Sequence, residues 1–233
     1  MPYEILGPVG VVVGIFAFFF LAVIAAGLWE KRPVQPYYVP DKGEEYQPST
    51  IARRANKDAA QMQYRQCGLC HDGKGKLYKI RYDFWISDDH TILAGIGSGT
   101  LAKVPVNGIW LYTLLDDGCV LSATNQAGEQ DISGVEDQAT WPQHNFTQMI
   151  EKHRSRMEGA AVEKFPDAQP MAAYFDMRRR KAEALVEMGY AYYLDDDQMV
   201  WRYNLKGAIA FYVVATWVRP IGRYFGKTGV ARS

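Results

Sequence analysis

The sequence lacks an excess of charge of either sign. Its 26 Lys and Arg residues balance 26 Asp and Glu residues, so the formal net charge at pH 7 is zero. Proteins that bind nucleic acid through its phosphates usually carry a basic excess. The composition therefore predicts no nucleic-acid partner, and it does not call for an acidic partner either.

Cysteine is scarce and the local motifs of catalysis are missing. The chain has three cysteines, an odd number that excludes a small secreted domain built on a disulfide framework. The sequence contains no HExxH zinc motif, no GxSxG nucleophile elbow and no nucleotide-binding glycine loop. These absences favour a non-catalytic protein, although active sites also assemble from residues far apart in the sequence.

What the chain does have begins with a long apolar run. Residues 5–29 carry no charged side chain and lie between Glu4 and Glu30. About 20 apolar residues cross a bilayer as a helix, so the run predicts one transmembrane helix over residues 1–30. The leader Met-Pro-Tyr-Glu lacks the basic segment of a secretory signal peptide, and we therefore expect an uncleaved anchor.

The charges around this run predict its orientation. No Lys or Arg precedes it, whereas Lys31 and Arg32 follow it directly. The positive-inside rule then places the N-terminus outside the inner membrane of the cell and the C-terminal domain in the cytoplasm. Gly10 and Gly14 form a GxxxG pair, which permits close approach of two spanning helices, so a homodimer is an option beside ordinary glycine use.

The rest of the chain divides by composition into three further segments. Residues 31–48 contain four prolines and predict an extended linker. Residues 49–165 predict an α+β domain, and residues 166–233 predict a helix, a β-hairpin and an amphipathic C-terminal helix. Together with the anchor, these segments give an α+β fold class built on an antiparallel meander with packed helices.

The clearest chemical motif follows a predicted helix that begins near Ser49. Cys67, Cys70 and His71 form a CxxCH pattern, which resembles the haem-attachment site of c-type cytochromes. The resemblance implies that Cys67 and Cys70 hold haem c through thioether bonds and that His71 is an axial metal ligand. The chain offers three candidates for the second axial ligand, Met149, His153 and Met171.

Two other interpretations of the same residues stay open. One is a zinc or redox site that uses Cys67 and Cys70 with His71 or His90, although no second CxxC or HxxxH completes a tetrahedral zinc site. The other is a pair of unmodified cysteines at the end of a helix. Haem c is attached outside the cytoplasmic membrane, so the predicted cytoplasmic side favours no cofactor, with haem c as the alternative.

The middle of the chain changes to a period of two. In residues 77–87 apolar side chains alternate with polar ones, which is typical of a strand with one buried face. Further strands are expected over 91–97, 100–106, 108–115 and 119–126, with a hairpin turn at Asn107-Gly108. The glycines of GIGSGT (95–100) are followed by a strand, so they predict a bulge or tight connection and no phosphate loop.

The C-terminal third predicts helices around a hairpin. Helical spacing marks residues 146–157 and 171–189, and the basic run Arg178–Lys181 is interpreted as a solvated helix face, with phosphate or membrane binding as the alternative. The hairpin over 190–206 resembles the wing of winged-helix modules, which would imply DNA binding. No helix-turn-helix precedes it and its acidic turn would repel phosphates, so DNA is not predicted. The last apolar segment, 207–218, fits either a buried helix or one at a membrane interface.

These patterns predict a single-pass membrane-anchored protein with a cytoplasmic α+β domain. The predicted function is non-catalytic protein-protein interaction or assembly at the membrane, with the lipid bilayer and a membrane or cytoplasmic protein as partners. The alternative is a membrane-anchored monohaem c-type cytochrome that transfers electrons through the CxxCH motif.

Overall fold

The computed structural model describes residues 11, 14–15, 17–18, 20–22, 24–25, 27–34, 48–72, 78–101, 104–126 and 131–211. The chain divides into two compact units. The larger unit is Pro33–Ala184, and the smaller unit combines Met1–Arg32 with Leu185–Ser233. The smaller unit therefore brings together the two ends of the chain.

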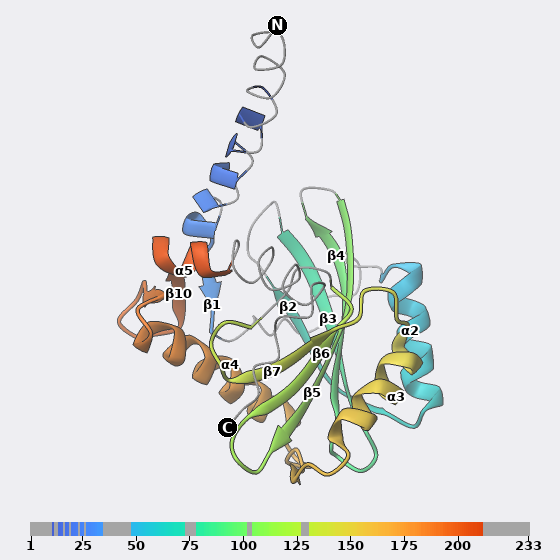
Figure 1. Ribbon diagram of the computed structural model, residues 1–233. Helices are drawn as coiled ribbons and strands as arrows, with labels where there is room; N and C mark the ends of the chain where they lie inside the picture. Colours follow the sequence, from blue (N-terminus) through green and yellow to red (C-terminus); the bar gives the residue numbers. More distant parts are fainter. Residues whose placement is uncertain are drawn as a thin grey trace, which may run out of the picture. The chain divides into compact units, whose positions relative to one another are not determined.

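The larger unit is organised around a seven-stranded mixed sheet (Figure 1). The strands follow the order β2-β3-β4-β5-β6-β7, and β8 pairs with β5. Neighbours from β2 to β6 are antiparallel, whereas β7 is parallel to β6. The strands are β2 (Arg65–Asp72), β3 (Tyr78–Ile86), β4 (Leu93–Leu101), β5 (Val104–Leu115), β6 (Val120–Thr124), β7 (Glu136–Thr140) and β8 (Val162–Glu163).

Helices α2 (Thr50–Gln61) and α3 (Phe146–Met157) lie side by side on one face of this sheet (Figure 1). Ser49 caps α2 by accepting a hydrogen bond from the Ala52 amide, and Asn145 and Gln148 form a capping box at α3. The core beneath the helices contains three small α2 residues and larger α3 and strand residues, including Ala52, Ala55, Ala59, Ile92, Ile96, Leu111, Phe146, Met149 and Ile150.

Helix α4 (Pro170–Glu187) covers the other face. Its residues Tyr174 and Met177 pack against Cys70, Phe84 and neighbouring strand residues. The period-two prediction for β3 is confirmed, because Ile80, Phe84 and Ile86 are buried on this face. The sheet thus has an apolar core on both sides, and the larger unit is a three-layer α+β structure.

The glycines of β4 make room for aromatic rings. A Cβ atom on Gly97 would lie 2.6 Å from the Trp110 ring, and one on Gly95 would lie 3.1 Å from the Phe84 ring. Gly108 in β5 faces the same Trp110 ring. The glycines therefore serve packing within the sheet and form neither a bulge nor a phosphate-binding loop.

Three strand predictions are wrong in detail. Asn107-Gly108 is no hairpin turn but lies inside β5, where Gly108 pairs with Gly97, because the glycine is needed for the Trp110 ring. The segment Cys67–His71 lies in β2 and not at a helix end, since Gln63 takes a φ of 62° and reverses the chain after α2. The segment Asp131–Trp141, whose polar composition predicts a turn, contains β7, which pairs with β6.

The smaller unit contains a three-stranded sheet of order β1-β10-β9. Its elements are β1 (Arg32–Pro33), β9 (Ala191–Tyr193), β10 (Val200–Tyr203) and α5 (Leu205–Ile209). The predicted C-terminal hairpin is confirmed by the antiparallel pairing of β9 and β10. Gly189 ends α4 with a φ of 66°, as expected for a glycine that follows a helix.

The prediction of a transmembrane helix is wrong. The described residues between 11 and 29 are helical, but among the described parts of the chain no helix is both long and apolar enough to cross a membrane. The assignment of a single-pass membrane protein depended on this helix, so it is not supported either. An apolar run indicates that a segment can be buried and does not by itself fix the length of a helix.

Several other predictions lie outside the described residues. They concern most of the proline-rich linker (35–47), the Gly10 half of the GxxxG pair, and the end of the last helix beyond residue 211. The predicted segment boundaries at residues 30, 48 and 165 stay predictions.

Candidate functional site

The CxxCH residues lie in edge strand β2 of the larger unit. The register of β2 against β3 shifts between Gln66 and Gly68, so Cys67 is an extra residue in a β-bulge. Beyond the bulge, Cys70 pairs with Tyr82 and His71 pairs with Arg81. Cys70 is fully buried in the core under α4, and Cys67 packs at the edge of the same core.

The two cysteines lie far apart along the strand, and the Cys67 thiol is protonated at neutral pH. Three residues of a β-strand span about 10 Å, whereas the Cα atoms of a disulfide lie at most about 7 Å apart. Burial raises the pKa of the Cys67 thiol to about 12, against a smaller lowering by Arg65. The protonated thiol is a poor nucleophile and metal ligand, so this strand geometry supports neither a redox disulfide nor a zinc-thiolate site.

The candidates for a second haem ligand are divided between the two faces of the sheet. Met171 of α4 lies over β2, where a Cβ on Gly68 would come within 2.8 Å of its sulfur. Met149 and His153 belong to α3 on the opposite face. Among the described residues, no group of three His, Cys, Asp or Glu side chains is placed to hold a metal ion. The haem assignment of Cys67, Cys70 and His71 stays a prediction.

His153 is a fully buried neutral side chain. Its Nε2 atom lies 3.0 Å from the Thr113 hydroxyl, which itself donates to the Thr91 carbonyl oxygen at 2.9 Å. Nε2 therefore carries the proton and donates to Thr113. Burial, with smaller effects of Arg156 and Arg154, lowers the pKa of His153 to about 3, so the imidazole is a structural group at neutral pH.

An ion cluster with two buried carboxylates holds α4 to the start of β7 and to the loop before it. Lys181 Nζ lies 2.6 Å from Glu136 and 3.3 Å from Asp131. The side chains of these carboxylates are only 5% and 4% exposed. The Lys181 charge and the Ser133 hydroxyl overcome burial and lower the pKa of Asp131. The charged groups of this cluster pair with one another, and these pairs order the loop before β7.

The basic run Arg178–Lys181 also binds groups of the chain itself. Arg178 donates to the carbonyl oxygens of Pro33 and Val34 at 2.9 and 3.1 Å. Arg179 pairs with Asp176, and Arg180 donates to the Gly118 carbonyl at 2.7 Å. Each of the four cations therefore contacts a group of the chain itself, which argues against the alternative of a phosphate site.

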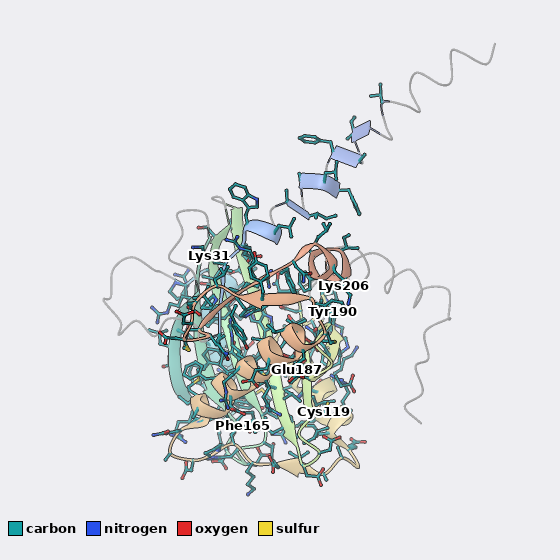
Figure 2. The ribbon with its side chains drawn as sticks, turned by 90° about the vertical axis from the view of Figure 1, so that its left-hand side faces the viewer. Lys31, Cys119, Phe165, Glu187, Tyr190 and Lys206 are labelled. Atoms are coloured by element: carbon teal, nitrogen blue, oxygen red, sulfur yellow. The ribbon has the colours of Figure 1, made fainter. Side chains whose placement is uncertain are left out.

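A shallow hollow lies at the turn between β5 and β6. Its volume is about 250 Å³, and Cys119, labelled in Figure 2, is one of the residues that line it. Arg180, one of its charged residues, is held by Asp176 at 3.3 Å and by the Gly118 carbonyl. The residues around it are Leu114, Leu115, Gly118, Cys119, Glu163, Ala173, Asp176 and Arg180. This set contains no base placed against a nucleophile.

Exposed apolar side chains gather in the smaller unit. Thirteen large apolar residues of the described chain are exposed, and only Ile51 belongs to the larger unit. The others come from the helical residues before Glu30, the end of α4, the β9–β10 hairpin and α5. They are Val11, Ile15, Phe18, Phe20, Leu21, Trp29, Met188, Tyr192, Leu194, Met199, Leu205 and Ile209.

Arg32 joins the two chain ends within this unit. Its guanidinium carbon lies 5.5, 4.9 and 5.3 Å from the ring centres of Trp201, Tyr203 and Phe211, and it forms an ion pair with Glu30. Each cation–π contact contributes about 0.5–2 kcal/mol. The apolar N-terminal residues and the hairpin therefore belong to one unit and are linked through Arg32. The sequence did not predict this arrangement.

Comparison with known proteins identifies no relative, since no family model, curated protein or solved structure matches the chain.

Proposed function

We propose that this protein is a non-catalytic protein-interaction module whose smaller unit is the contact surface. The observation that carries the proposal is the distribution of exposed apolar side chains, twelve of thirteen of which lie in the smaller unit. Large exposed apolar patches mark interaction sites in soluble proteins. The larger unit buries its apolar residues on both faces of its sheet and serves as the support.

The polar groups of the larger unit favour a structural role over catalysis. His153 is enclosed and neutral, and Lys181 is held between two buried carboxylates. General acid–base catalysis needs a titratable group that can reach a substrate. These groups instead bind to their own neighbours within the fold.

Site-specific photo-crosslinking in the native cell tests the proposal. A benzophenone amino acid is placed at Phe18, Trp29 or Leu205, which are 70%, 81% and 57% exposed. Ile51 is the matched control, because it is an apolar residue with 61% exposure on the larger unit. We expect the three positions of the smaller unit to form an adduct with the same protein, and the Ile51 position to form none.

Two results would contradict this function. Equal adducts from Ile51 would show that exposure alone explains the crosslinks. Adducts with lipid but with no protein would assign the surface to the predicted bilayer partner. The predicted cytoplasmic location likewise stays a prediction, which a compartment-dependent reporter fused to the C-terminus would test.

Electron transfer is the second candidate, and the CxxCH motif supports it. The visible spectrum of the protein purified from its native cells, with a haem stain of a denaturing gel, tests it directly. Covalently retained haem that is lost in Cys67→Ala and in Cys70→Ala would establish the carrier. A colourless protein of correct mass would remove this candidate.

A further inference from the structure

The β9–β10 hairpin has one buried face and one exposed face. Ala191, Trp201 and Tyr203 are buried, on the side of the Arg32 guanidinium. The residues between them alternate to the other side, where Tyr192 and Leu194 are 44% and 37% exposed. We call the surface formed by Tyr190, Tyr192, Leu194, Val200 and Arg202 the outer hairpin face.

Charges of opposite sign mark the two ends of this face. At the tip, Asp195, Asp196 and Asp197 form the turn between the strands. The Asp195 carboxylate accepts hydrogen bonds from the Met199 and Val200 amides, whereas Asp196 and Asp197 are exposed. The turn thus presents two acidic side chains to a neighbour.

The base of the hairpin is basic. Lys206 Nζ lies 4.7 Å from the centre of the Tyr190 ring (Figure 2) and donates to the Met188 carbonyl oxygen at 3.2 Å. Arg202, opposite Tyr192 in the register, adds a second cation near the middle. The base at Tyr190 and the tip after Leu194 are four strand steps apart, which is about 13 Å at the rise of a strand.

We propose that the outer hairpin face binds the same face of a second copy of this chain. A two-fold axis through the middle of the hairpin places the acidic tip of each copy against the basic base of the other. It also brings Tyr192 and Leu194 of both copies together. An apolar patch with opposite charges at its ends is self-complementary in the way that a two-fold interface requires. This proposal rests on the proposed function and names one binding partner of the smaller unit, which is a second copy of the chain.

The pairing is expected to be weak and sensitive to salt. A short hairpin buries less than the roughly 1,200 Å² typical of stable interfaces. Exposed charges are screened over about 10 Å at 0.1 M salt. Self-association should therefore weaken as the salt concentration rises.

Charge reversal tests the pairing in the full-length protein. The tip variant carries Asp196→Lys and Asp197→Lys, and the base variant carries Lys206→Glu. Sedimentation equilibrium in one mild detergent buffer measures self-association of the wild type, each variant and their equimolar mixture. Like charges across an interface cost several kcal/mol, so each variant should self-associate at least about tenfold more weakly. The mixture should regain wild-type association, because it pairs a basic tip with an acidic base.

The mixture also guards against a folding defect, since two misfolded variants would not restore association. The proposal is overturned if the wild type is monomeric, if both variants associate like the wild type, or if the mixture stays dissociated. The experiments distinguish failure of hairpin self-association from failure of the proposed function. Crosslinks from Phe18 and Trp29 to a different protein would still support that function if the hairpin did not self-associate.

Discussion

At the residue scale, the glycines of β4 and the histidine of α3 have structural roles that their sequence patterns did not reveal. The alternating glycines of β4 resemble ligand-binding loops, but they make room for the rings of Phe84 and Trp110. His153 shares the helical spacing of Met149 and Ile150 and lies with them in the core. Helical spacing predicted α3, and only the packing showed that the imidazole is fully enclosed.

The burial of His153 predicts a pH dependence of stability. The unfolded chain binds a proton near pH 6.5, whereas the folded His153 has a pKa of about 3. The unfolded state therefore takes up more protons between these values. Stability contributed by neutral His153 is complete above pH 6.5 and falls by about 1.4 kcal/mol per pH unit below it.

Urea unfolding at pH 7 and pH 5 measures this effect. We expect the wild type to lose about 2 kcal/mol of unfolding free energy between the two values. The His153→Leu variant should lose less, because it has no buried imidazole to charge. Parallel pH profiles for the two proteins would contradict the role of His153.

The packing of Gly97 predicts a steric cost. In the Gly97→Ala variant the new methyl group lies 2.6 Å from the Trp110 ring and 3.0 Å from the Tyr82 ring. Overpacking of this kind costs about 1–3 kcal/mol. Chemical denaturation should show that loss, and adding Trp110→Leu should make the alanine substitution less costly. A Gly97→Ala variant as stable as the wild type would refute this explanation of the glycine.

At the scale of elements, the long-range pairings were the hardest to foresee. Alternation of polar and apolar residues predicted β3, the capping position near Ser49 predicted α2, and helical spacing predicted α3. The parallel pairing with β6 brings β7 into the sheet, although the polar sequence of β7 carries no strand signal. The ion pairs of Lys181 with Asp131 and Glu136 likewise depend on how α4 docks on the sheet.

The anchoring role of Lys181 is tested against its neighbour on the same helix. Lys181→Met leaves two carboxylates of low exposure without their lysine, and loss of one member of a buried ion pair costs about 3 kcal/mol or more. Arg179→Met removes a cation whose side chain is 59% exposed, so it should change stability by less than about 0.5 kcal/mol. Denaturation of both variants makes the comparison, and equal costs would contradict the anchoring role.

Arg32 is predicted to hold the smaller unit together. Arg32→Ala removes the cation from three aromatic rings. Amide hydrogen exchange in β10 and α5 should then become faster, whereas Lys31→Ala should leave it unchanged, because Lys31 is exposed. Unchanged exchange in the Arg32→Ala variant would show that the aromatic contacts do not stabilise the unit.

At the scale of the whole molecule, composition and pattern identified an α+β chain but misjudged its apolar N-terminal run. Hydropathy reported that residues 5–29 are apolar and gave no measure of helix length, and the predicted transmembrane helix was wrong. The same residues instead belong to a unit that also contains the C-terminal hairpin. No local motif could reveal this, because the unit is assembled from opposite ends of the sequence.

The central claim is that the smaller unit contacts another protein while the larger unit supports it. The most direct measurement compares photo-crosslinks from Trp29 and from Ile51 in the living cell, two exposed apolar positions on different units. The account predicts a discrete protein adduct at Trp29 and none at Ile51. Identical adducts at both positions, or only lipid adducts at Trp29, would contradict it.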